Sequence, residues 1–205
     1  MPSIDHPYMA HLKKDKRLVS ILDNHAPFVL KKKRNICLDL CASIMSQQLS
    51  TKVAETIFKR FLLLFEHADP KPSEILAIEY QQLRSIGLSH AKASYIHNVA
   101  NFAIEKGMTN RKLNAMSNEE VIGYLSEIKG VGRWTVEMLL MFTLGREDVF
   151  AVDDFGIQQS MAKLYRIEHL SNKELKQKMI KISEKWMPYR TYACLHLWNY
   201  KDTPK

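Results

Sequence analysis

Apolar residues recur along this chain at the three- and four-residue spacing of amphipathic helices, and no stretch shows the sustained alternation of a half-buried strand. The longest such series predicts a helix with one apolar face and runs through Leu49, Val53, Ile57, Phe61 and Phe65. Because this helical period persists along most of the chain, we expect no β-strands. The sequence therefore predicts an all-α fold.

Two helix starts can be placed from capping boxes, in which a Ser side chain and a Glu three residues later satisfy each other's backbone N–H groups. Ser117 with Glu120 marks one start, and Ser171 with Glu174 marks another. No low-complexity linker and no internal repeat separates independent segments. We expect residues 1–205 to form one helical unit with two lobes and a groove between them.

Charge favours an acidic partner. Lys and Arg number 30 against 22 Asp and Glu, so the formal net charge is +8. A basic protein of 205 residues is large enough to bury a core without disulfides or metal, and its charge suits an acidic polymer or surface. Basic proteins without any nucleic-acid role are equally compatible with this charge.

Cysteine usage and the first residues bear on the cell compartment. The three cysteines, Cys37, Cys41 and Cys194, do not form a metal-ligand set, and the first two have the apolar neighbours of a helical core. The first residues are charged where a signal peptide is apolar, and no run is long enough to span a membrane. We expect a cytoplasmic protein with no membrane partner, associated with the nucleoid, or a nuclear one in a eukaryotic cell.

The segment 125–161 contains the most informative pattern. A helix is predicted to end near Ile128, a short turn holds Gly130 and Gly132, and a second helix starts at once. Glycines in such a turn leave backbone N–H groups accessible beside a helix N-terminus, which is an arrangement that binds phosphate. Lys129 and Arg133 flank the turn and could add ionic contacts. A Gly-x-Gly turn that merely reverses the chain is the alternative interpretation.

Two adjacent carboxylates follow this hairpin. Asp153 and Asp154 come after an apolar run and precede another amphipathic helix. One of the pair can cap that helix. A second carboxylate facing a cleft is suited to stabilising positive charge on a sugar whose glycosidic bond is breaking, or to orienting water.

The segment resembles the helix-hairpin-helix superfamily of DNA glycosylases, and within it the alkylpurine, or 3-methyladenine, glycosylases. The resemblance extends over most of the chain from residue 43 onward, through the four blocks 43–57, 83–102, 125–161 and 184–198. It implies the helix-hairpin-helix glycosylase fold, with the hairpin at about residues 121–145 and a DNA-binding groove between two lobes.

The same resemblance assigns roles at the reaction centre. Asp154 takes the position of the catalytic aspartate, which leaves Asp153 as the helix cap or a support. Trp134 stands where the strand-cleaving branch carries its nucleophilic lysine, so lyase activity is not expected, because an indole cannot form a Schiff base. Trp134 and Trp198 are expected in the base pocket, with Met138 at a position where bacterial relatives can show tyrosine. Core packing is the alternative for Trp134.

The resemblance also defines a DNA-binding set. Gln48 is expected to fill the gap left by a flipped nucleotide, whereas without the resemblance Gln47 and Gln48 would be read as solvated loop residues. The full set expected to contact DNA is Gln47, Gln48, Ser50, Lys129, Gly130, Val131, Gly132, Arg133 and Thr135.

These features together lead to a functional expectation. We expect a monomeric, monofunctional DNA glycosylase that excises alkylated purines of the 3-methyladenine and 7-methylguanine type from double-stranded DNA in base excision repair. No cofactor or metal is expected, although a monovalent cation at the hairpin fits the resemblance; the cysteine set of an iron–sulfur cluster is absent. A glycosylase for deaminated or oxidised bases and a non-catalytic DNA-binding module remain the alternatives.

Overall fold

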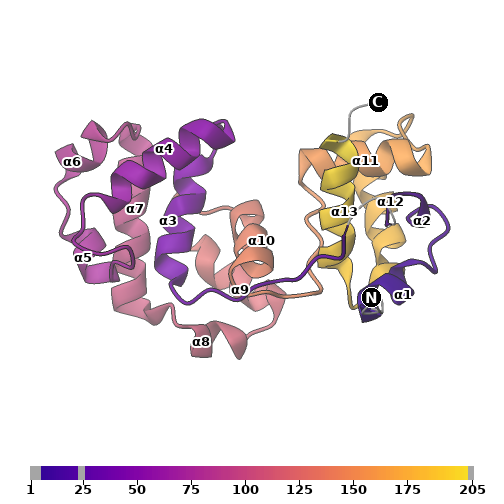
Figure 1. The fold of residues 1–205 in the computed structure, drawn as a ribbon, viewed down its shortest axis with the longest axis horizontal. Helices are drawn as coiled ribbons and strands as arrows, with labels where there is room; N and C mark the ends of the chain where they lie inside the picture. Colours follow the sequence, from indigo (N-terminus) through magenta and orange to yellow (C-terminus); the bar gives the residue numbers. More distant parts are fainter. Residues whose placement is uncertain (1–5, 23–25, 203–205) are drawn as a thin grey trace. The chain divides into compact units, whose positions relative to one another are not determined.

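The computed structural model describes residues 6–22 and 26–202, and all regular structure in these ranges is helical (Figure 1). The prediction of an all-α fold is confirmed. Two compact units make up the chain. The first unit combines residues 1–31 with residues 145–205, and the second consists of residues 32–144. Both ends of the sequence therefore belong to the same unit.

The second unit contains the hairpin and most of the residues expected to contact DNA. A single turn of π-helix, η1, follows its longest helix. The helices of this unit are α3 (Ile36–Ser46), α4 (Thr51–Leu62), α5 (Pro72–Leu76), α6 (Tyr80–Ser85), α7 (His90–Phe102), η1 (Ala103–Gly107), α8 (Asn110–Asn114), α9 (Asn118–Ser126) and α10 (Arg133–Phe142).

Helix α3 forms the centre of the second unit and packs against α4, α7 and α10. Its sequence is mostly apolar, and Leu40, Cys41 and Ile44 are fully buried. Cys37 is also buried, so both cysteines of this helix pack in the core as the sequence predicted. A buried central helix gives the helices around it a fixed support.

Capping chemistry fixes the start of α9. The Ser117 hydroxyl accepts a hydrogen bond from the backbone N–H of Glu120, and the Glu120 carboxylate accepts one from the N–H of Ser117. This confirms the capping box predicted there. The expected hairpin is formed by α9 and α10, which are joined by residues 127–132.

The first unit packs its C-terminal helix against α11, while α12 lies against α11 as well. The predicted capping box of Ser171 and Glu174 at the start of α12 is confirmed. The helices of this unit are α1 (Pro7–Leu12), α2 (Val19–Leu22), α11 (Phe155–Tyr165), α12 (Asn172–Ser183), the 3-10 turn η2 (Glu184–Trp186) and α13 (Arg190–Asp202).

Asp15 ties the N-terminal segment to the rest of the first unit. Its Oδ2 accepts hydrogen bonds from the Tyr165 hydroxyl over 2.7 Å and from the Trp186 indole N–H over 3.1 Å. Burial raises the pKa of the Asp15 carboxyl, but these hydrogen bonds outweigh burial and place the pKa below its ordinary value. The contacts explain why residues separated by about 150 positions form one unit.

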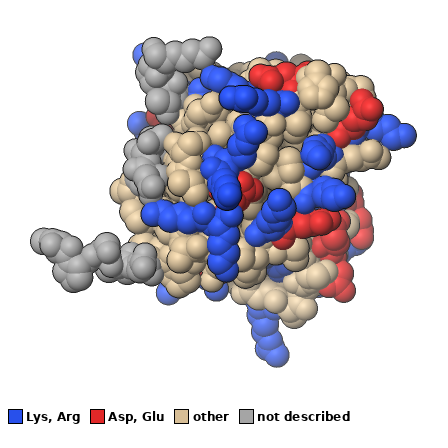
Figure 2. Space-filling model, turned by 90° about the vertical axis from the view of Figure 1, so that its right-hand side faces the viewer, with Lys and Arg blue, Asp and Glu red and all other residues tan. Residues whose placement is uncertain are grey.

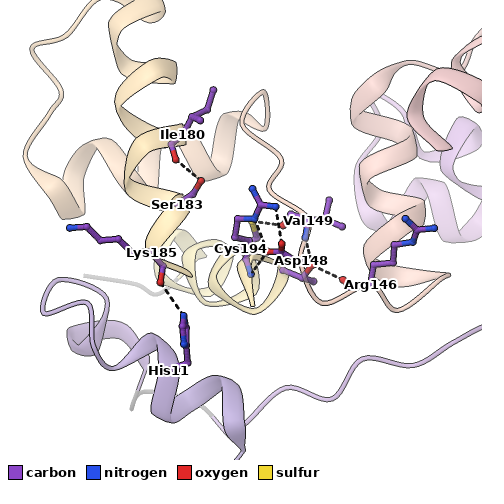
Figure 3. Close-up of polar contacts among 10 residues, drawn as sticks. His11, Arg146, Asp148, Val149, Ile180, Ser183, Lys185 and Cys194 are labelled. Carbon is purple, nitrogen blue, oxygen red and sulfur yellow. Dashed lines mark hydrogen bonds and ion pairs between the residues drawn. The ribbon is translucent and has the colours of Figure 1, made fainter. Parts of the chain in front are cut away.

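The loop before α11 is anchored on the start of α13 (Figure 3). The Arg190 guanidinium donates to both carboxylate oxygens of Asp148, over 2.6 and 2.9 Å. The Thr191 hydroxyl accepts from the N–H of Val149 and donates to the carbonyl of Arg146. These contacts fix the chain only a few residues before the Asp153–Asp154 pair.

Basic side chains gather across one face of the first unit (Figure 2). The exposed lysines of this unit include Lys14, Lys16, Lys173, Lys178 and Lys181. This unit therefore carries part of the basic excess noted in the sequence. None of the described helices is both long enough and apolar enough to cross a membrane.

Candidate nucleic-acid interface and active site

The hairpin turn rests on α7. Gly130 has a φ of +103°, which favours glycine, and a Cβ added there would lie only 2.2 Å from the ring of Tyr95. Asn98, one turn further along α7, donates from Nδ2 to the carbonyl of Lys129 over 3.2 Å. Gly130 is therefore needed both for its conformation and for the close approach of the aromatic ring.

Gly132 has a different reason to be glycine. Its φ is −98°, which any residue can adopt, and no atom lies within 4 Å of the position that a Cβ would take. It forms the N-cap of the ten-residue helix α10 and is exposed. The first backbone N–H groups of a helix have no partner within it and attract anions. The absence of a side chain leaves room for an anion to approach these groups.

The loop between α3 and α4 is bonded to this hairpin. The Gln47 amide donates to the hydroxyl of Thr135 over 3.3 Å and to the carbonyl of Gly130 over 3.5 Å. Lys92 donates from Nζ to the carbonyls of Met45 and Gln47 and so holds the other side of the loop. Burial lowers the pKa of Lys92. The two segments expected to contact DNA thus form one surface of the second unit.

Gln48 projects from this loop. Its side chain is exposed, and its backbone has a left-handed φ of 59°, which is uncommon for a residue with a side chain. Ser50, two residues later, is the exposed N-cap of α4. The chain therefore turns sharply at Gln48, and this position suits a side chain that enters a gap in a base stack.

Arg133 was expected to offer its charge to a DNA phosphate, but its guanidinium is engaged within the protein. Its guanidinium forms a two-pronged contact with Glu119, over 2.5 and 2.9 Å, and a third contact with Glu137 over 3.0 Å. The hydrogen bonds that Arg133 donates to Glu119 hold the pKa of Arg133 well above its ordinary range. Arg133 therefore joins α9 to α10, whereas Lys129 is exposed beside the turn.

Two further residues of the predicted DNA-binding set have buried side chains. Val131 packs in the core, and the Thr135 hydroxyl is occupied by Gln47. Contacts from these two positions to DNA would have to come from their backbone atoms. Fewer side chains than expected are therefore available for contacts with DNA.

Helix α10 presents an apolar stripe beyond the hairpin. Trp134 is 40% exposed and Phe142 is 43% exposed, and Met138 lies between them at the four-residue spacing of one helix face. Met138 and Phe142 line a groove of about 290 Å³ between α3, α4 and α10. The core-packing alternative for Trp134 is thus wrong, since a core side chain would be buried.

Asp154 is the N-cap of α11 in the first unit. Its Oδ1 accepts the backbone N–H of Ile157 over 2.9 Å, and the residue is 8% exposed. The resemblance left Asp153 as the helix cap or a support, and the prediction that Asp153 is the cap is wrong. Asp153 is exposed and forms an ion pair with Lys176 over 2.6 Å. The extended backbone of Asp154, with φ −70° and ψ 121°, is the conformation that a cap requires.

Trp198 lies beside this carboxylate. Its indole N–H donates to Oδ1 of Asp154 over 2.9 Å. Oδ1 therefore receives two N–H donors, one from the start of α11 and one from α13. Gly156 allows this packing, because a Cβ there would stand 3.3 Å from the Trp198 ring. The indole thus orients the carboxylate, a role that the expectation of a pocket wall did not include.

The sequence analysis missed three supporting residues. Lys92, Tyr95 and Glu119 hold the loop, the turn and Arg133, respectively. Lys92 and Tyr95 lie on α7, far in sequence from the segments they support, and Glu119 lies on the helix before Arg133, 14 residues away, outside the three- and four-residue spacings of a local pattern. Within the described part of the chain, no group of three or more His, Cys, Asp or Glu residues is placed to hold a metal ion.

Comparison with known proteins gives consistent results. Residues 41–188 match the family described as HhH-GPD superfamily base excision DNA repair protein. DNA-3-methyladenine glycosylase 1 of Schizosaccharomyces pombe is 36% identical over 185 residues, which are 89% of this chain and 80% of that protein.

Solved structures agree with the sequence comparison. A 3-methyladenine DNA glycosylase of S. pombe in complex with abasic DNA has a TM-score of 0.82 at 34% identity, covering 97% of this chain and 98% of the other. A DNA-3-methyladenine glycosidase of Bacillus halodurans has a TM-score of 0.85 at 34% identity, covering 97% and 91%. The similarity extends over nearly the whole of this chain.

Proposed function

Since the chain belongs to the HhH-GPD superfamily of base excision DNA repair proteins, we propose that it is a monofunctional glycosylase that removes alkylated purines from double-stranded DNA. The product pair is a free base and an abasic site. A relative of known structure is bound to abasic DNA, which is the DNA product of such a reaction. We further propose that the enzyme acts as a monomer.

The observation that supports the chemistry best is the placement of Asp154. The carboxylate is almost fully buried, and two N–H donors from different helices hold one of its oxygens. A carboxylate held in this way needs no reorganisation when positive charge develops on the deoxyribose, so its full electrostatic effect is available in the transition state.

The leaving group explains why one carboxylate is sufficient. Alkylation at a ring nitrogen gives the purine a positive charge, so the base departs as a neutral molecule without a strong general acid. Asp154 stabilises the oxocarbenium-like sugar and orients the water that attacks it. The proposed steps require neither a redox cofactor nor a metal ion.

The second unit supplies the contacts with duplex DNA. Backbone N–H groups at Gly132 and the start of α10 bind a phosphate, and Lys129 adds a positive charge beside the turn. Gln48 enters the space vacated by the flipped nucleotide, where its amide can hydrogen-bond the orphaned base. Because Gln47 joins the two segments, phosphate binding and Gln48 insertion use one surface.

A base-release assay tests this function. Duplexes that contain 7-methylguanine, hypoxanthine or 8-oxoguanine are incubated with excess enzyme, and the released base is quantified. We expect 7-methylguanine to be released faster than hypoxanthine or 8-oxoguanine. Faster release of hypoxanthine or 8-oxoguanine would favour a glycosylase for deaminated or oxidised bases, and binding without any release would favour a non-catalytic module.

A further inference from the structure

The groove between α3, α4 and α10 has a chemical character of its own and lies wholly within the second unit. The groove is lined by Ala42 of α3, by Ala54 and Phe58 of α4, and by Phe142 of α10. The rings of Phe58 and Phe142 come from different helices, and both of these helices pack on α3. A volume of about 290 Å³ is at the small end for ligand sites and suits one flat ring system.

Two serine hydroxyls that line the groove already donate their protons to backbone carbonyls. Ser43 donates from Oγ to the carbonyl of Asp39 over 3.0 Å, and Ser46 donates to the carbonyl of Ser43 over 2.9 Å. Each hydroxyl has only one proton, so toward a ligand these two groups can act only as acceptors. The serines therefore favour a ligand that brings its own N–H donors.

Two carboxylates add negative charge to the same groove. Glu55 lines it from α4 and is exposed, and Asp39 lines it from α3. The Asp39 Oδ1 pairs with Lys33 over 3.0 Å, which neutralises the only cation that lines the groove in the described part of the chain. Its Oδ2 is buried and has no hydrogen-bond partner among the described residues. The groove thus has an excess of acceptors and of negative charge.

We propose that this groove selects a cationic heteroaromatic ring that carries N–H donors, with Glu55 and Asp39 as the specificity-determining residues. The inference rests on the proposed function, because it identifies the flipped base as the ligand. An alkylated purine fits each feature: its flat ring packs between phenylalanines, its positive charge suits the carboxylates, and its amino group can donate to the serines. Neutral lesions such as hypoxanthine lack the charge.

The charge preference can be measured as a ratio of rates. Single-turnover excision of 7-methylguanine and of hypoxanthine is compared for the wild type, Glu55→Gln and Asp39→Asn, with Glu105→Gln as a control of equal charge change outside the groove. We expect the ratio of 7-methylguanine to hypoxanthine rates to fall about fivefold in Glu55→Gln, the effect of one partly exposed ion pair. The control should keep the wild-type ratio.

The outcomes separate this inference from the proposed function. An unchanged ratio in both folded groove variants would overturn the inference, and so would an equal loss on both substrates. A second readout needs no catalysis: ligand-observed NMR at pH 6 compares binding of 7-methylguanosine and guanosine. A preference for 7-methylguanosine that Glu55→Gln abolishes supports the groove assignment even if no base is released, in which case the proposed function fails alone. Equal binding of both nucleosides by the wild type would overturn the assignment.

Discussion

The indole N–H of Trp198 and the Oδ1 of Asp154 are joined by a hydrogen bond of 2.9 Å between residues 44 positions apart. The bond connects α13 to the first residue before α11, so the C-terminal helix fixes the orientation of the candidate catalytic carboxylate. Asp154 therefore depends on two helices for its placement. The cap hydrogen bond from Ile157 and the indole hydrogen bond from Trp198 reach the same oxygen, Oδ1, from two different helices.

Trp198→Phe is expected to slow excision by about ten- to a hundredfold while leaving duplex binding unchanged, because a hydrogen bond to a charged group contributes about 1.5–3 kcal/mol. Phenylalanine keeps an aromatic ring but has no N–H donor. Single-turnover rates and anisotropy titrations measure the two effects separately. Normal excision by the variant would show that the cap contact alone orients Asp154.

Asp154→Asn should lower the excision rate by about a hundredfold or more, since it removes the negative charge opposite the developing sugar cation. Asparagine is also a good N-cap, so α11 should remain intact and the melting curve should stay close to that of the wild type. Asp153→Asn is the matched control. Its exposed ion pair with Lys176 contributes little, so near-wild-type excision is expected. A larger defect in the Asp153 variant would reverse the assignment of the pair.

The two hairpin glycines should respond differently to alanine. Gly132→Ala places a methyl group in open space, so the fold should persist while binding to damaged and undamaged duplexes weakens alike. Gly130→Ala should lower the melting temperature, because a left-handed φ costs alanine about 1–2 kcal/mol and the new Cβ meets Tyr95. Thermal melting measures the stability of both variants, and fluorescence anisotropy measures their binding to duplex DNA. A loss in Gly132→Ala confined to damaged DNA would contradict phosphate binding at this turn.

Borohydride should trap no covalent enzyme–DNA species, because Trp134 provides no amine. The lysines near the hairpin include Lys92 and Lys129. Lys92 has a lowered pKa, but its ammonium donates to two backbone carbonyls, and Lys129 is exposed at the turn. Incubation with an abasic duplex and borohydride, followed by denaturing electrophoresis, makes the test. A trapped band that Lys92→Met or Lys129→Met removes would identify a lyase nucleophile.

Sequence reasoning succeeded where the determinants are local. The capping boxes at Ser117 and Ser171 depend on residues three apart, and the structure confirms both. The helical period alone was enough for the fold class. The cap of α11 was misassigned because Asp153 and Asp154 both have the side chain of a good N-cap. Only the backbone dihedrals at Asp154 decide between them.

Contacts between distant segments could not be predicted in this way. Arg133 was expected to bind phosphate, yet Glu119 and Glu137 hold its guanidinium. The Glu119 contact depends on how α9 folds back along α10, and a short sequence window contains no information about that packing. The role of Trp198 was incomplete for the same reason, since its partner belongs to another helix.

The hydrogen bond from Gln47 to Thr135 has an evolutionary consequence. The amide N–H of Gln47 donates to the Thr135 hydroxyl, and this buried hydroxyl would lose its Gln47 donor if position 47 became apolar. An apolar substitution at position 47 alone would therefore remove this donor from a buried hydroxyl, and an apolar substitution at position 135 alone would leave Gln47 with only the Gly130 carbonyl. Among related sequences, positions 47 and 135 should covary, even though 88 residues separate them and neither is a candidate for the chemistry.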